Sequence, residues 1–209
     1  MRYEGYGDPR AVMVFDSVSA AIRHTMLDTP EQRVAPGGRR AHLYERVLQG
    51  RGNLMLATRY DTVSGRLTAL WSKEPTFGFG WIPARGTASA YEQAICAWWN
   101  STPGRLLLLN RRAKKLTYPK WSVAHLTSLP VPRPASKGCA ELTGAWNRYR
   151  HEPMLPLRNA ENCIARQAID EAAAFALGLD SGVVADWRRR LAAEPTITNA
   201  RAHEERRDI

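Results

Sequence analysis

The sequence contains little cysteine, no secretory signal and no apolar run of membrane-spanning length. Its three cysteines, Cys96, Cys139 and Cys163, are an odd number at scattered spacing, so neither a disulfide framework nor a zinc knuckle is predicted. The first ten residues lack the apolar segment of a secretory signal. No uninterrupted apolar run approaches the roughly 20 residues of a transmembrane helix. These absences predict a cytoplasmic protein in a reducing compartment, with no membrane partner.

Signatures of nucleic-acid enzymes are also missing. The sequence has no Asn/Asp-Pro-Pro-aromatic tetrapeptide of amino-group methylation, no P-loop, and no Pro-Asp followed by the Glu-x-Lys of a metal-dependent nuclease. Residues 77–80, Phe-Gly-Phe-Gly, superficially resemble a glycine loop for a methyl-donor cofactor. They lack the preceding apolar strand and the following acidic residue that would hold a nucleotide. We therefore interpret them as a turn and predict no cofactor.

The sequence predicts no catalytic residue and no metal ligand. None of the five histidines pairs with a cysteine or carboxylate at metal-ligand spacing. Cys96 and His125 could in principle form a nucleophile pair, but nothing in the sequence activates the thiol. These searches leave open whether the chain is part of an enzyme.

What is present favours an α+β fold with a small antiparallel β-sheet. Residues 54–60 form an apolar run of strand length, and residues 66–71 alternate between apolar and polar. The turn-forming residues 61–65 lie between them, so the pattern predicts a β-hairpin. Residues 77–81 then lead into a third short strand.

Helical patterns flank this sheet. Short helices are predicted at residues 17–27 and 41–49. Ser89 and Glu92 stand at capping-box spacing and predict the start of a longer helix. After it, an amphipathic segment continues to about Leu116.

The C-terminal third is predicted to be helical. Apolar residues repeat at helical spacing in two segments, which contain Ile164, Ala168, Ala172, Phe175 and Ala176, and then Val184, Trp187 and Leu191. Gly178 and Pro195 are the expected ends of these two helices. The proline-rich residues 129–134 predict an extended connector before this region, and the polar tail from Thr198 is expected to be disordered.

The distribution of charge is the strongest functional signal. The formal net charge is +10, yet residues 93–140 contain eight basic residues and no Asp or Glu. The remaining residues, with 22 basic and all 20 acidic side chains, are nearly neutral. A continuous acid-free segment of this kind favours a positive surface that neutralises the phosphates of a nucleic acid.

Specific contact residues follow from this pattern. The candidates for phosphate contact are Arg111, Arg112, Lys114, Lys115 and Lys120, and those for base or groove contact are Arg59, Arg66 and Tyr118. The aromatic residues among these bases could stack on bases or sugars. Alternatively, residues 111–115 form only the solvated face of a helix whose residues 106–109 are buried. Trp98 and Trp99 are predicted to lie in the core.

From residue 53 to about 200, the chain resembles the C-terminal part of adenine-specific DNA methyltransferases of restriction–modification systems. The resemblance lies in paired strands, a turn, a helix ending in Asn-Ser, a short strand ending in Leu-Pro-x-Pro, and closing helices. The matching pieces are residues 54–60, 65–69, 80–83, 94–104, 126–132, 166–179 and 187–195. Their order along the chain is more specific than any single piece.

The resemblance implies a target-recognition region that grips double-stranded DNA. In that family an N-terminal Rossmann-like domain binds S-adenosylmethionine, and this sequence lacks it. The chain is therefore expected to be non-catalytic alone and to act with a separate methyltransferase catalytic subunit. An RNA-binding module and a scaffold that docks a separate methylase remain alternatives. The expected organisation is an N-terminal segment, 1–52, a recognition region, 53–135, a helical region, 136–197, and a tail, 198–209.

Overall fold

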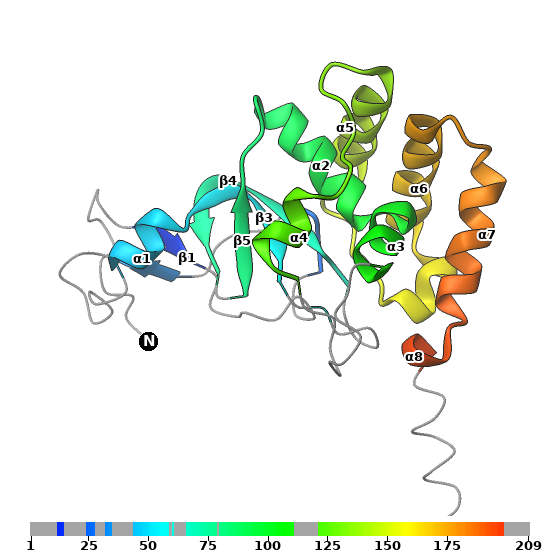
Figure 1. Cartoon of the computed structure of the whole chain (residues 1–209), viewed down its shortest axis with the longest axis horizontal. Helices are drawn as coiled ribbons and strands as arrows, with labels where there is room; N and C mark the ends of the chain where they lie inside the picture. The colour runs from blue at the N-terminus through cyan, green and yellow to red at the C-terminus, as the bar shows by residue number, and fades with distance from the viewer. Residues whose placement is uncertain are drawn as a thin grey trace, which may run out of the picture.

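The computed structural model describes residues 12–14, 24–27, 32–34, 44–58, 60, 66–78, 80–110 and 121–198. Within these ranges the protein has an α+β fold, as predicted. A β-sheet lies at one end of the molecule and a helical C-terminal part at the other, with helices α2, α3 and α4 between them (Figure 1). The helices are α1 (Tyr44–Gln49), α2 (Ser89–Asn100), α3 (Thr102–Asn110), α4 (Val123–Thr127), α5 (Lys137–Tyr149), α6 (Ile164–Leu177), α7 (Ser181–Ala192) and α8 (Pro195–Thr198), with a 3₁₀ helix, η2 (Leu157–Asn162).

The sheet is built on three antiparallel strands. Its order is β2-β1-β4-β3-β5, and the strands are β1 (Val12–Val14), β2 (Gln32–Val34), β3 (Gly52–Ala57), β4 (Ala69–Phe77) and β5 (Trp81–Ala84). Strand β3 pairs antiparallel with both β4 and β5, and Leu56 lies opposite Ala69 on one side and Ile82 on the other. Strand β1 joins β4 in parallel and β2 antiparallel. The predicted hairpin and third strand are therefore confirmed.

Both faces of β3 are buried, which explains its continuous apolar sequence. Leu54 and Leu56 face the main core, whereas Met55 and Ala57 lie in a smaller cluster on the opposite face. Because successive side chains of a strand point to opposite faces, burial of both sides requires apolar residues at every position.

Strand β4 runs farther than predicted because a bulge accommodates its polar middle. The pairing with β3 shifts between Gly52 and Leu54, where Lys73, Glu74 and Pro75 are exposed. The side chain of Asn53 donates to the carbonyl oxygens of Ser72 and Lys73 at 2.9 and 3.0 Å. A bulge is one of the few places where a proline fits within a sheet.

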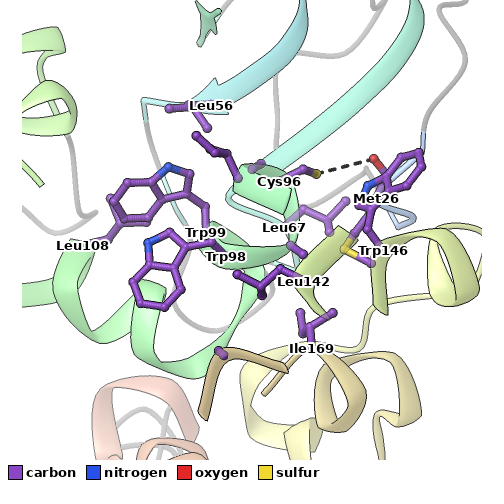
Figure 2. Close-up of a cluster of buried hydrophobic side chains, with 14 of the residues drawn as sticks. Met26, Leu56, Leu67, Cys96, Trp98, Trp99, Leu108, Leu142, Trp146 and Ile169 are labelled. Carbon is purple, nitrogen blue, oxygen red and sulfur yellow. Dashed lines mark hydrogen bonds between the residues drawn. The ribbon is translucent and has the colours of Figure 1, made fainter. Parts of the chain in front are cut away.

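Helix α2 connects the sheet to the C-terminal helices. It packs against β3 and β4 on one side and against α5 and α6 on the other. Figure 2 shows Cys96, Trp98 and Trp99 of this helix within the main core, where the Cys96 thiol lies 3.8 Å from the carbonyl oxygen of Met26. Trp98 and Trp99 are buried, which confirms their predicted core role.

The predicted capping box at the start of α2 is wrong. Ala88 is the N-cap residue and Ser89 already belongs to the helix. The Glu92 carboxylate instead accepts from the indole N–H of Trp71 and from the backbone N–H of Gly86, both at 3.1 Å. A tertiary contact between helix and sheet has taken the place of the local cap.

The C-terminal helices begin and end at recognisable residues. Gly178 ends α6 in the left-handed conformation with φ of 67°, as its position predicts. The Asp180 carboxylate accepts from the Gly182 backbone N–H at 2.8 Å and caps α7. Pro195 follows α7 but begins α8, so it does more than end the preceding helix. Ile164 and Phe175, two members of the apolar repeat in this region, are 67% and 54% exposed.

Two further predictions are wrong. Residues 24–27 of the predicted helix 17–27 are not helical. The Leu27 backbone N–H donates to the carbonyl oxygen of Arg150 at 3.0 Å, and Leu27 forms an isolated β-bridge with Trp71. Residues 17–23 lie outside the described residues. The short strand expected from the resemblance at residues 126–132 is instead the end of α4 followed by an extended connector. Among the described residues, no helix has the length and apolarity needed to cross a membrane.

Candidate nucleic-acid interface

The structure describes only one of the eight predicted contact residues. This residue is Arg66, which is partly exposed just before β4. The other seven, Arg59, Arg111, Arg112, Lys114, Lys115, Tyr118 and Lys120, lie outside the described residues. The structure does describe the residues that flank them, and the positions of these flanking residues bear on the site.

The flanking residues meet beside the end of β3. The backbone N–H of Trp121 donates to the carbonyl oxygen of Thr58 at 2.9 Å. The rings of Tyr60 and Trp121 lie with their centroids 6.5 Å apart. The Trp121 indole N–H also donates to the carbonyl oxygen of Leu108 at 2.8 Å, which ties it to α3. The chain positions next to Arg59 and Lys120 are therefore held together.

Arg105 of α3 contacts residues at this meeting point. Its guanidinium donates to the Tyr60 hydroxyl and to the carbonyl oxygen of Arg66. A third, longer hydrogen bond of 3.4 Å reaches the carbonyl oxygen of Asn100. The guanidinium carbon lies 4.8 Å from the centre of the Tyr60 ring, a cation–π contact.

Because Arg105 is buried, the acid-free segment offers fewer positive charges at the surface than its sequence suggests. Arg105 is only 1% exposed, so it does not offer its charge directly to a ligand. Burial lowers its pKa to about 10, because desolvation disfavours the charged form, and the neighbouring Arg166 acts in the same direction. The guanidinium is nevertheless charged at neutral pH.

A second buried arginine, Arg166 of α6, uses the same acceptors. Its two terminal nitrogens donate to the carbonyl oxygens of Asn100 at 2.9 Å, Leu155 at 3.1 Å and Arg66 at 3.3 Å. Its Nε is buried and has no hydrogen-bond partner. We call Arg105 and Arg166, with the carbonyl groups of Arg66 and Asn100 that they share, the arginine junction.

The side chain of Asn100 fixes the helix end that supplies one of these carbonyls. Its amide oxygen accepts from the Thr68 backbone N–H at 2.9 Å, and its amide nitrogen donates to the carbonyl oxygens of Ala69 at 2.7 Å and Cys96 at 2.9 Å. These bonds join the end of α2 to the start of β4. The Asn-Ser element noted in the resemblance is thus a buried structural connection in this protein.

A separate polar cluster connects α3 with α7. Asp170 accepts from the backbone N–H and hydroxyl of Thr102 at 2.6 and 2.7 Å, and from Arg188 at 3.1 Å. Arg188 also contacts Glu161 at 2.9 Å. Burial raises the pKa of the Asp170 carboxyl, while the Thr102 contacts, the charge of Arg166 and the Arg188 contact oppose that rise. Asp170 is therefore a buried polar contact of α6.

The described part of the acid-free segment after Trp121 has an exposed surface without carboxylates of its own. His125, Arg133 and Lys137 are exposed on α4, the connector and the start of α5. The connector is held along α2, because the carbonyl oxygens of Pro130 and Pro132 accept from side chains of that helix. The extended connector predicted at residues 129–134 is confirmed.

The structure gives no support for catalysis by Cys96. Its side chain is fully buried, and burial raises the pKa of the thiol more than the neighbouring Trp146 and Asn100 side chains lower it. His125 is exposed on α4. Within the described ranges, no three His, Cys, Asp or Glu side chains are grouped so that they could hold a metal ion.

Sequence reasoning missed the arginine junction, although a signal for half of it is present. Arg166 occupies the same helical face as Ile169, Asp170 and Ala173, all of which are buried. The sequence around Arg105 carries no comparable sign of burial, because Arg105 is one of the eight basic residues of the acid-free segment and resembles the others.

Comparisons of the chain with protein-family models, with curated proteins and with solved structures find no match.

Proposed function

We propose that this chain binds double-stranded DNA as the non-catalytic recognition part of an adenine-specific methyltransferase system. The main support is the acid-free segment 93–140. Its described surface after Trp121 includes His125, Arg133 and Lys137 and no carboxylate. Lysine and arginine side chains that neutralise phosphates supply most of the affinity of such interfaces. The burial of Arg105 leaves seven of the eight bases as candidates for this surface.

The meeting of Thr58, Tyr60, Arg66 and Trp121 adds a second line of support. It joins the hairpin and the segment after α3 at one place, although they are distant in sequence. Positive side chains offered from two neighbouring segments can contact more phosphates of one duplex than either segment alone. Methyl transfer itself is assigned to a separate methyltransferase catalytic subunit.

The test is titration of a labelled, mixed-sequence DNA duplex with the purified chain, followed by competition with an RNA duplex of the same sequence. DNA binding that weakens steeply with added salt and that RNA displaces poorly is expected. Tighter binding to the RNA would favour the RNA-binding module instead. Absence of binding to both would contradict the proposal, and capture of a separate methylase would then favour the scaffold.

A further inference from the structure

Three exposed basic residues, Arg85, Arg133 and Lys137, lie close to the starts of α2 and α5. Arg133 and Lys137 belong to the acid-free segment, whereas Arg85 lies outside it, in the loop between β5 and α2. The sequence does not relate Arg85 to the other two, because they are distant along the chain. The contacts of the first turn of α2 bring their chain positions together.

Tyr91, in the first turn of α2, links the loop of Arg85 to the connector. A Cβ atom at Gly86 would lie 3.0 Å from the Tyr91 ring, so this glycine packs directly on the ring. At the far end of the same side chain, the Tyr91 hydroxyl donates to the carbonyl oxygen of Pro132 at 3.0 Å. Gly86 follows Arg85, and Pro132 precedes Arg133. The chain neighbours of the two arginines are therefore joined by a single tyrosine side chain.

A tight turn fixes Arg133 relative to Lys137. The carbonyl oxygen of Arg133 accepts from the backbone N–H and the hydroxyl of Ser136, at 3.3 and 2.7 Å. Ala135, the third residue of this turn, has φ of 57°, a conformation in which glycine or asparagine is usual. Ser136 also caps α5 by accepting from the Cys139 N–H at 3.1 Å, and Lys137 is the first residue of that helix. Both basic side chains thus extend from a hydrogen-bonded backbone.

The three bases have little negative charge around them. Glu92 lies in the first turn of α2, but its two oxygens accept from the Trp71 indole N–H and the Gly86 backbone N–H. Glu141, the first acidic residue after the acid-free segment, is exposed one helical turn beyond Lys137 and marks the edge of the positive surface. Among the described residues, none of the three bases forms an ion pair with a carboxylate. Their charges are available to an anionic ligand.

We propose that Arg85, Arg133 and Lys137 form a phosphate-contacting surface, the connector surface, that binds the backbone of a DNA duplex. The inference rests on the proposed function, and it adds a contact residue from outside the acid-free segment. Because the three groups come from a loop, a turn and a helix start, they suit a ligand whose charges repeat along its length. Phosphate contacts of this kind position a protein on the duplex without reading its sequence.

The first measurement uses the unchanged protein. The chain has five lysines, and the structure describes two of them, Lys73 and Lys137, both exposed. Limited acetylation followed by mass spectrometry compares the accessibility of each lysine with and without a mixed-sequence duplex. We expect the duplex to slow acetylation of Lys137 and to leave that of Lys73, which lies beside Glu74 on β4, unchanged.

The second measurement removes the positive charges. One variant combines three changes at the connector surface, Arg85→Gln, Arg133→Gln and Lys137→Gln. The control neutralises three exposed arginines elsewhere, Arg148→Gln, Arg158→Gln and Arg190→Gln, so that both variants have the same net charge. Duplex affinity is measured by fluorescence anisotropy over a range of salt, well below the melting temperature of each variant.

We expect the connector variant to bind the duplex at least about tenfold more weakly at low salt. Its salt dependence should flatten by about three units of slope, roughly one for each lost phosphate contact. The control should lose less affinity and keep the slope of the unchanged protein. Glu141→Gln tests the same surface in the opposite direction and should strengthen binding, because it removes a negative charge at the edge.

The two measurements separate this inference from the proposed function. If the unchanged protein binds the duplex but Lys137 is not protected, or the connector variant matches the control, the connector surface is wrong and the proposed function stands. If the unchanged protein binds no duplex, the proposed function is contradicted and the connector surface with it.

Discussion

The backbone N–H of Trp121 donates to the carbonyl oxygen of Thr58 at 2.9 Å, although the two residues are far apart in sequence. This hydrogen bond connects the acid-free segment at Trp121 to the residue that follows β3. Two of the predicted contact residues, Lys120 and Arg59, are the immediate chain neighbours of this pair.

Replacement of Asn100 by alanine should destabilise the fold by about 3 kcal/mol. The change would leave the Thr68 backbone N–H and the carbonyl oxygen of Ala69 without their side-chain partner in a buried setting. Urea unfolding followed by tryptophan fluorescence measures the effect. Asn147→Ala, at an exposed position on α5, is the matched control and should change stability by less than about 0.5 kcal/mol. Equal effects of the two changes would contradict the role assigned to Asn100.

Gly104→Ala should also destabilise the protein, by about 3 kcal/mol, because α2 and α3 meet too closely for a side chain. A Cβ atom at residue 104 would lie 2.1 Å from the carbonyl oxygen of Trp98. Gly144→Ala is the control: it lies within α5 with no atom within 4 Å of the added carbon. Because alanine favours a helix, that change should raise the melting temperature and add about 1 kcal/mol of stability. Thermal unfolding distinguishes the two, and a tolerated Gly104→Ala would show that the helix junction differs from the one described.

S-adenosylmethionine should not bind to this chain alone. The stretch that superficially resembles a cofactor loop, at residues 77–80, begins at the last residue of β4, and just before β5 the Trp81 N–H donates to the Gly78 carbonyl oxygen at 3.1 Å. Gly80 has φ of 81°, which a tight turn of this kind requires. Isothermal titration calorimetry with the cofactor is expected to give no binding heat. A saturable signal would mean that the chain carries a methyl-donor site, and it would contradict a function in recognition alone.

The sheet and the long helices could be predicted from the sequence because their signals are local. The apolar run in β3 and the glycine after α6 each determine structure within a few residues. Glu92 shows where this reasoning ends: its spacing from Ser89 is that of a cap, but its carboxylate contacts Trp71 across the core. Helix α4 was missed because a helix of five residues carries almost no periodic pattern.

The burial of Arg105 could not be predicted, because it depends on acceptors from distant parts of the chain. Arg105 receives its partners from Tyr60 and Arg66 of the hairpin region and from the end of α2. In the sequence it reads as one more base of the acid-free segment. Only the arrangement of the elements separates it from the bases available to a ligand.

The most direct test of the DNA proposal is reversal of charge in the acid-free segment. Arg111, Arg112, Lys114 and Lys115 are changed together to glutamate, and duplex affinity is measured by fluorescence anisotropy at several salt concentrations. The control reverses four exposed arginines elsewhere in the chain, Arg148, Arg158, Arg189 and Arg190, so that the net charge is the same.

We expect the first variant to lose at least about a hundredfold in affinity and to show a much flatter salt dependence, because each lost phosphate contact removes about one unit of slope. The control should keep most of the affinity and the slope of the unchanged protein. If both variants bind alike, net charge and not the acid-free segment governs binding, and the proposed DNA interface is contradicted.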